Sequence, residues 1–175
     1  MSEQEKTFII YDIETFKKFF CVVFKYQGRY LTFEISERKD QEIELKAFLR
    51  KGIKNGWYFV GFNNIRFDAQ VLQWILDKGH KVLQGMSGDK KAKEIHAFAQ
   101  EVIIKTSMKQ FPPYPEYKLD NKQIDLFLQN HYNNKARSTS LKWLEYSMNW
   151  KKVQDLPHKH DDETLGVDTF DPIIE

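Results

Sequence analysis

The chain has 175 residues, a length typical of one domain, so we expect a single domain spanning residues 1–175. Hydrophobic residues make up 41% of it and charged residues 30%, a balance that excludes collagen-like, coiled-coil and wholly disordered chains. No apolar run approaches the roughly 18 residues of a membrane span, and no cleavable apolar leader precedes the first strand-like run. The one cysteine, Cys21, excludes an internal disulfide and fits a reducing compartment, so we expect a cytoplasmic location.

Charge is unevenly distributed along the chain, although the net charge is only +2. The stretch 135–152 contains five basic residues and one acid, whereas 161–175 contains six acids and no lysine or arginine. A basic stretch of this kind can follow a phosphate backbone, but it is also ordinary for a solvated surface. The charges alone therefore leave both interpretations open.

The first half of the chain predicts a strand meander, a helix and a further strand. Runs of β-branched and aromatic residues indicate four strands: Thr7–Tyr11, Phe19–Lys25, Arg29–Ile35 and Trp57–Gly61. Gly28 lies in the short connection between the second and third runs, where a hairpin requires positive φ. The segment Asp40–Lys51 predicts an amphipathic helix that buries Ile43 and ends before Gly52.

The second half predicts helices with one more strand among them. A helix begins near Asp68 with apolar residues at helical spacing, and a strand is expected over Glu101–Ser107. The Gly- and Lys-rich segment Gly79–Ala92 predicts a loop, and three prolines make Phe111–Pro115 an exposed connection. Two helices then follow: Ile124–Gln129 and Ser140–Tyr146. This order predicts an α/β fold, with a mixed β-sheet and helices on both faces.

Two carboxylates, Asp12 and Glu14, directly follow the first predicted strand. Side chains two residues apart in an extended chain lie on the same face, so both would project together at the strand's carboxyl end. Two like charges so close require a cation, and oxygen ligands suit Mg²⁺ or Mn²⁺ better than zinc. The spacing is also common by chance, and a pair of exposed acids beside a turn is the alternative interpretation.

A second segment adds a candidate third carboxylate. The residues Gly61-Phe62-Asn63-Asn64-Ile65-Arg66-Phe67-Asp68 follow a predicted strand and open a predicted helix. Together with Asp12-Ile13-Glu14, this segment resembles the first two motifs of the DEDD 3′–5′ exonucleases, in particular the proofreading domain of family-B, phage-type DNA polymerases. The resemblance implies a ribonuclease-H-like fold, two Mg²⁺ or Mn²⁺ ions, and catalytic metal ligation by Asp12, Glu14 and Asp68.

The same resemblance implies which residues would hold the 3′ end of single-stranded DNA. They lie in or beside the first two motifs and in a later Ser-Leu pair: Thr15, Phe16, Asn63, Phe67, Ser140 and Leu141. Lys152 would take the place of a lysine that assists catalysis in the protein-primed phage polymerases. A polymerase domain would follow on the C-terminal side, in a bacterial or phage-infected host cell.

One motif of this family is not found. The third motif, Y-x-x-x-D or H-x-x-x-x-D, supplies the fourth carboxylate, and the H-x-x-x-D formed by His158 and Asp162 is one residue short. We therefore expect a chain truncated before this motif, with Asp171 and Pro172 beginning the helix that would carry it. Two alternatives stay open: a non-catalytic single-stranded nucleic-acid-binding module of the same fold, and an exonuclease directed at RNA.

Overall fold

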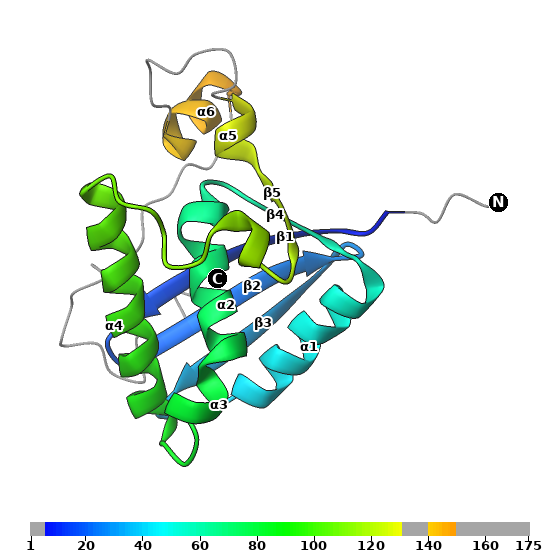
Figure 1. Cartoon of the computed structure of the whole chain (residues 1–175). Coiled ribbons are helices and arrows are strands. Elements are labelled where there is room, and N and C mark those ends of the chain that lie inside the picture. The colour runs from blue at the N-terminus through cyan, green and yellow to red at the C-terminus, as the bar shows by residue number, and fades with distance from the viewer. Residues whose placement is uncertain (1–5, 131–139, 150–175) are drawn as a thin grey trace.

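The computed structural model describes residues 6–130 and 140–149. Its centre is a five-stranded sheet in the order β3-β2-β1-β4-β5, with β1 (Phe8–Phe16) in the middle (Figure 1). The other strands are β2 (Phe19–Tyr26), β3 (Arg29–Ser36), β4 (Tyr58–Gly61) and β5 (Lys122–Asp125). Strand β2 is antiparallel to β1 and β3, β4 is parallel to β1, and β5 is parallel to β4. This sheet confirms the predicted α/β fold class with a mixed β-sheet.

The first three strands form the expected meander because a two-residue turn joins β2 to β3. Gln27 and Gly28 both have positive φ, 49° and 75°, as a turn whose twist matches the flanking strands requires. Strand β1 is longer than predicted and continues to Phe16. Asp12 and Glu14 therefore lie inside a paired strand rather than after its end.

Helix α1 (Glu42–Asn55) connects β3 to β4 and packs against the sheet through Leu45 and Leu49, which are fully buried. The prediction that Ile43 is buried was wrong, because its side chain is 77% exposed. Leu45 and Leu49 are four residues apart and therefore share one face of the helix, which is the face turned to the core.

Two glycines determine where α1 ends and how closely it approaches the sheet. Gly56, with φ 65°, caps the helix in the left-handed conformation. Gly52 lies inside the helix, where a Cβ would come within 2.8 Å of the Phe59 ring. The predicted end at Gly52 was wrong because this glycine serves close packing and not chain reversal.

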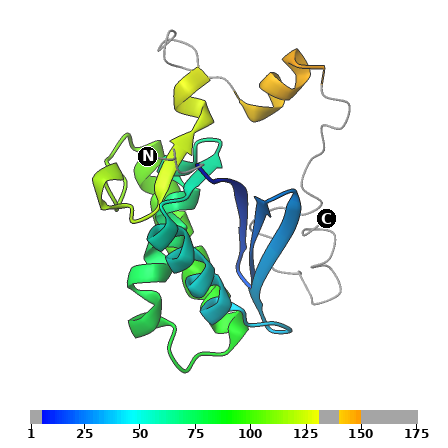
Figure 2. The ribbon, with the colours of Figure 1, turned by 90° about the vertical axis from the view of Figure 1, so that its right-hand side faces the viewer.

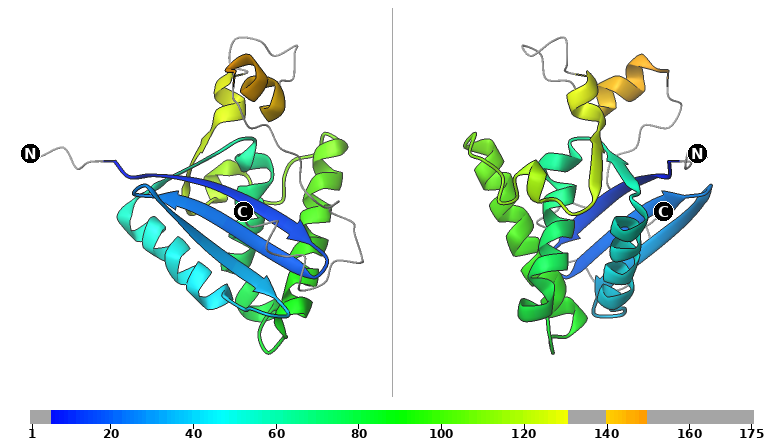
Figure 3. Two further views of the ribbon diagram at one scale, coloured as in Figure 1. Left: turned by 180° about the vertical axis from the view of Figure 1, so that it is seen from behind. Right: turned by 45° about the vertical axis from the view of Figure 1, so that its right-hand side comes forward.

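Helices α2 (Asp68–Asp77) and α4 (Gly88–Ser107) lie on the same face of the sheet as α1, and the core fills the space between these layers (Figure 2). Viewed from behind, the strands lie in front of α2 and α4 (Figure 3). Within the described residues no helix packs on this second face, where Phe8 and Ile10 are 52% and 55% exposed. The prediction of helices on both faces is therefore confirmed for one face only. Among the described residues, no helix covers the second face.

Helix α4 replaces a predicted loop and a predicted strand. The short α3 (Gly79–Val82) and the start of α4 occupy the expected loop, and Glu101–Ser107 forms the end of α4. Its β-branched residues suggested a strand, but Val102 is buried while its neighbours Ile103 and Ile104 are 45% and 51% exposed. Two consecutive exposed side chains fit a helical period and not strand alternation.

The segment after α4 returns the chain to the sheet. Phe111–Pro115 has neither helix nor strand, as predicted, and Phe111 is 92% exposed. The predicted helix Ile124–Gln129 was wrong in its first residues, which pair with β4 as β5 before α5 (Leu126–Asn130) begins. Pairing with β4 in the sheet thus overrides the apolar spacing that suggested a helix.

Helix α6 (Leu141–Ser147) confirms the last predicted helix. Its predicted N-cap, Ser140, accepts a hydrogen bond from the Trp143 N–H at 3.2 Å. Among the described residues, no helix is both long enough and apolar enough to cross a membrane. The predictions made for the tail lie outside the described residues, and they concern Lys152, His158, Asp162, Asp171 and Pro172.

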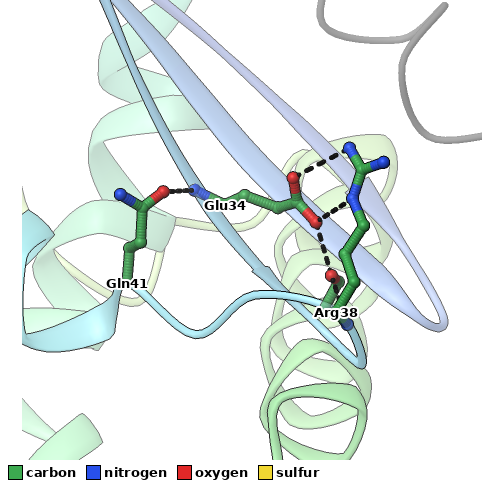
Figure 4. Close-up of polar contacts among 4 residues, drawn as sticks. Glu34, Arg38 and Gln41 are labelled. Carbon is green, nitrogen blue, oxygen red and sulfur yellow. Dashed lines mark hydrogen bonds and ion pairs between the residues drawn. The ribbon is translucent and has the colours of Figure 1, made fainter. Parts of the chain in front are cut away.

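An ion pair closes the turn between β3 and α1 (Figure 4). The Glu34 carboxylate is 2% exposed and accepts two hydrogen bonds from the Arg38 guanidinium, at 2.8 and 3.0 Å. The Glu34 N–H donates to Oε1 of Gln41 at 3.1 Å, so the same residue also fixes the start of α1. A two-pronged pair of this kind is geometrically specific.

Lysines neutralise the two acids that follow. Lys91 of α4 contacts Asp40 and Glu42, each at 2.7 Å, and Lys46 forms a second ion pair with Glu42. We call Glu34, Asp40 and Glu42, together with these cations, the β3–α1 junction. Each carboxylate of the junction faces a positive charge.

Candidate active site

Strand β1 presents Asp12 and Glu14 on the face opposite the core. Burial alternates along the strand: Ile13 is buried, Asp12 is exposed and Glu14 is partly buried. Because successive side chains of a strand point to opposite faces, the two carboxylates lie on one face. The arrangement predicted for this pair is therefore present within the strand.

Asp68 lies beside β1 where the neighbouring strand has ended. The parallel ladder to β4 covers Phe8–Ile10 of β1, so the backbone edge beyond Ile10 is open to another acceptor. There Oδ1 of Asp68, the first residue of α2, accepts a hydrogen bond from the Ile13 N–H at 3.3 Å. A carboxylate from the distant second motif thus takes a position next to Asp12 and Glu14.

The three carboxylates affect one another's protonation. Burial, followed by the charge of Asp12, raises the pKa of Asp68 well above its ordinary value. The same two causes raise the pKa of Glu14 to about 8. Asp12 is exposed as a whole residue, but surrounding groups remove water from its carboxyl and raise its pKa, while its hydrogen bond with the Asp68 carboxyl acts in the opposite direction. Two carboxyl groups can share a hydrogen bond only while one carries a proton, so this group needs a proton or another cation.

The donor set fits a hard divalent cation. Its donors are carboxylate oxygens, which favour Mg²⁺ or Mn²⁺ over softer metals, and their mutual repulsion would be relieved by positive charge. In the part of the chain that the structure describes, no group of three or more His, Cys, Asp or Glu side chains is arranged to hold a metal ion. Asp12, Glu14 and Asp68 influence one another's pKa values without forming such a group.

Asp125, at the end of β5, fixes the loop that leads to Asp68. Its carboxylate is 4% exposed and accepts hydrogen bonds from the N–H groups of Asn63 at 2.8 Å and Ile65 at 3.3 Å. A third bond, from the Phe127 N–H at 2.9 Å, ties it to α5. Sequence analysis did not identify this role, because the three donors come from two distant segments and no local pattern marks them.

A buried polar network ties the same loop to the sheet. Asn64, fully buried, donates through Nδ2 to the Tyr11 hydroxyl at 3.3 Å and to Oε1 of Gln123 at 2.9 Å. The Tyr11 hydroxyl in turn donates to the same Gln123 oxygen at 3.0 Å. Burial raises the pKa of Tyr11 well above its ordinary value, so the hydroxyl keeps its proton and remains a donor. Strands β1 and β5 thereby hold the second motif in place.

A cavity of about 1050 Å³ has the chain neighbours of two of these carboxylates in its wall. Thr15 and Phe67, which follow Glu14 and precede Asp68 in the chain, are both in its wall. The wall comes from the end of β1, the short 3₁₀ helix η1 (Asn64–Arg66) and its flanks, and α4. It consists of Thr15, Lys17, Asn63, Arg66, Phe67, His96, Gln100, Ile103, Thr106 and Ser107.

Three of the six residues predicted to hold a DNA end line this cavity, namely Thr15, Asn63 and Phe67. The side chain of Phe16 is fully buried in the protein, so only its backbone is available to a ligand. Ser140 and Leu141 are not part of the cavity wall. Their proposed contacts, and the role of Lys152, stay predictions.

Sequence analysis missed the wall that α4 contributes. His96, Gln100 and Ile103 recur at helical spacing, but the predicted strand over Glu101–Ser107 concealed this pattern. His96 is 7% exposed, and its Nδ1 lies 3.3 Å from the carbonyl oxygen of Thr15. A carbonyl oxygen only accepts, so Nδ1 is the donor and α4 is tied to the end of β1.

Comparison with known proteins gives distant structural likenesses only. No protein-family model matches the chain, and no curated protein matches it. It is similar to exonuclease I in a product-bound form and to the zinc-bound form of an E. coli exonuclease I complex with single-stranded DNA. Each shares 16% identity at a TM-score of 0.40, covering 78% and 79% of this chain but only 34% and 32% of those structures. The chain spans about a third of their length, and so distant a likeness assigns neither a family nor a substrate.

Proposed function

We propose that this chain is a metal-dependent 3′–5′ exonuclease domain that hydrolyses the terminal phosphodiester of single-stranded DNA. The observation that carries the proposal is the grouping of Asp12, Glu14 and Asp68 around the end of β1. Their raised pKa values and all-oxygen chemistry fit a site that holds divalent cations. A role in proofreading within a longer polymerase, and a cytoplasmic location in a bacterial or phage-infected cell, belong to the same proposal.

Asp12, Glu14 and Asp68 would hold two Mg²⁺ or Mn²⁺ ions. When bound, such ions supply an activated water and neutralise charge on the phosphoryl oxygens. The Ile13 N–H keeps the Asp68 carboxylate oriented toward β1, so the ligand set is preorganised from two elements. Lys152 is proposed to assist the same reaction.

The cavity residues would hold the end of the strand. The Phe67 ring offers a surface on which a base can stack, an interaction worth about 1–3 kcal/mol per base with little dependence on sequence. Thr15 and Asn63 supply polar groups in the same wall. Ser140 and Leu141 are proposed to contact nucleotides farther along the strand.

A second candidate function is a non-catalytic module that binds single strands. It is favoured by one observation, that the described residues form no complete cage of three metal-binding side chains. Such a module would bind single-stranded nucleic acid with or without a divalent cation, and loss of Asp12 or Glu14 would not weaken it.

The decisive experiment follows a 5′-labelled single-stranded oligodeoxynucleotide incubated with the purified chain and Mg²⁺ or Mn²⁺. We expect a ladder of products shortened from the 3′ end. Asp12→Asn or Glu14→Gln should slow it by about two to three orders of magnitude, the scale for losing one electrostatic catalytic group. Glu44→Gln, an exposed glutamate on α1, is the control for the same chemical change and should leave the rate unaltered.

Two results would reject the proposal. A wild-type rate in Asp12→Asn would show that the carboxylates do not carry the reaction. Binding that is insensitive to EDTA, with no shortening in either metal, would favour the non-catalytic module. Matched RNA and DNA strands in the same assay decide the substrate, and exclusive cleavage of RNA would contradict the DNA assignment.

A further inference from the structure

The cavity contains positive charge that the proposed metal chemistry does not use. Lys17, just beyond β1, and Arg66, at the end of η1, both line it; Arg66 is exposed and Lys17 partly buried. They belong to two different elements and share one wall with the Phe67 ring. Two cations thus line a cavity whose wall also contains Thr15, which follows Glu14, and Phe67, which precedes Asp68.

This arrangement has an electrostatic consequence for a polyanionic ligand. A DNA strand that brings a phosphodiester to Asp12, Glu14 and Asp68 meets charges of its own sign. Cations such as Lys17 and Arg66 would offset that repulsion for a strand that also occupies the cavity. An arginine is suited to this task because its planar group can donate two hydrogen bonds to one phosphate.

Helix α4 contributes further residues to the wall of this cavity. On α4, His96, Gln100 and Ile103 line the cavity, and the bond from His96 Nδ1 to the Thr15 carbonyl fixes this helix against the end of β1. Thr15 lies in the chain between Glu14 and Lys17, so this one contact ties α4 to the segment that carries both side chains. A volume of about 1050 Å³ also reaches the upper end of the usual range for ligand pockets, which leaves room for more than one nucleotide.

We propose that Lys17 and Arg66 bind the phosphates that precede the terminal phosphodiester, and that α4 closes the cavity around this end of the strand. The inference rests on the proposed function and names substrate-positioning residues for it. It assigns α4 a direct part in holding single-stranded DNA. Replacing Lys17 or Arg66 raises KM more than it lowers kcat, since their contacts with the strand are present both before and during the reaction.

The test measures binding without cleavage. Fluorescence anisotropy in EDTA follows a labelled oligodeoxythymidylate of about ten nucleotides, a length within the site sizes of single-strand binding folds. Affinity is recorded over a range of salt concentrations for wild type, Lys17→Gln and Arg66→Gln. Lys54→Gln is the control, because Lys54 is an exposed lysine on α1 outside the cavity wall and gives the same change in charge.

The slope of log affinity against log salt is negative, and each cavity variant should make it shallower by about 0.7, the value for one lost phosphate contact on a single strand. Lys54→Gln should keep the wild-type slope. A neutral variant, Gln100→Trp, should weaken binding several-fold by filling the cavity while leaving net charge unchanged. Melting temperatures confirm that each variant is folded.

The inference is overturned if the slopes of the two cavity variants equal that of Lys54→Gln, or if Gln100→Trp binds as well as wild type. Its failure is distinct from failure of the proposed function. Unchanged slopes together with an inactive Asp12→Asn would reject the cationic wall and retain the nuclease. Lowered slopes together with a fully active Asp12→Asn would retain the binding surface and reject the proposed chemistry.

Discussion

Two groups of carboxylates in the same fold differ in what faces them. In the β3–α1 junction the acids are paired with cations: Glu34 with Arg38, Asp40 with Lys91, and Glu42 with Lys46 and Lys91. At the candidate active site, the charges that act on the pKa of Asp68 are those of two more carboxylates, Asp12 and Glu14. The acids of the junction are balanced by arginine and lysine side chains, whereas at the candidate site the charge of Asp12 raises the pKa values of Glu14 and Asp68.

This difference separates a structural cluster from a functional one. A buried ion pair that keeps its partners fixes local geometry, because removal of one partner leaves a charge that the protein cannot solvate. A cluster of like charges lowers the stability of the empty protein, and such local inconsistencies are expected where a ligand must bind. The comparison predicts opposite responses to neutralising substitutions in the two groups.

The largest effect on stability is expected in the junction. Lys91→Met removes the cation shared by Asp40 and Glu42 and should lower the free energy of unfolding by about 3 kcal/mol. This is the low end for a broken buried pair, because Asp40 keeps 37% exposure and can recover some hydration. Urea denaturation measures the change as a lower midpoint at constant slope.

Lys90→Met is the control for this substitution, since Lys90 is an exposed lysine on the same helix. We expect it to change stability by less than about 0.5 kcal/mol, as for ordinary surface substitutions. Equal midpoints for the two variants would mean that the stability of the junction does not depend on Lys91. The contrast between the junction and the candidate site would then not hold.

Strands β1 to β4 could be predicted from sequence because their signals are local, whereas the start of the predicted helix Ile124–Gln129 is strand β5. Gly28 marked a hairpin, the strand alternation placed Asp12 and Glu14 on one face, and Ser140 marked a helix start. The end of α1 and the identity of α4 could not be predicted, because both depend on tertiary contacts. Gly52 is required by the approach of Phe59, and the β-branched end of α4 is helical because Val102 reaches the core.

The candidate site divides in the same way. The three carboxylates were found from two motifs whose spacing is visible in one sequence, as were Thr15, Asn63 and Phe67 of the cavity. The roles of Asp125 and His96 were not visible, because each depends on a backbone group brought from a distant segment, the Asn63 N–H and the Thr15 carbonyl. Positions in a motif can be read locally, but their supports are defined only by the fold.

The next effect is a pH dependence of the metal-free protein that comes from Glu14. Its ordinary pKa is 4.5, and burial followed by the charge of Asp12 raises the pKa in the folded protein to about 8. The unfolded carboxyl therefore releases its proton at a lower pH than the folded one. The stability contribution is fully present below 4.5 and is lost as the pH rises through about 8.

Thermal melting in EDTA at about pH 5 and about pH 8.5 measures this loss. Relative to Glu14→Gln, which cannot ionise, the wild-type melting temperature should fall by several degrees between the two values. Mg²⁺ added at the higher pH should restore it in wild type and less so in the variant, because a cation that binds only the folded state stabilises it. An equal change in melting temperature between the two pH values for wild type and Glu14→Gln in EDTA would contradict the raised pKa of Glu14.

The smallest effect is expected at Asp68, which we compare with Asp125, a second buried aspartate in different surroundings. Asp68→Asn should raise the stability of the metal-free protein by about 1 kcal/mol, the scale at which functional sites give up stability, because it removes a charge that Asp12 and Glu14 oppose. Its Oδ1 can still accept from the Ile13 N–H, so the local backbone keeps its partner. Asp125→Asn should instead destabilise the protein by about 1.5–3 kcal/mol, the worth of hydrogen bonds to a charged group, because that carboxylate accepts from three N–H groups. Urea midpoints of both variants in EDTA must therefore move in opposite directions, and a fall in both would show that Asp68 is a structural residue.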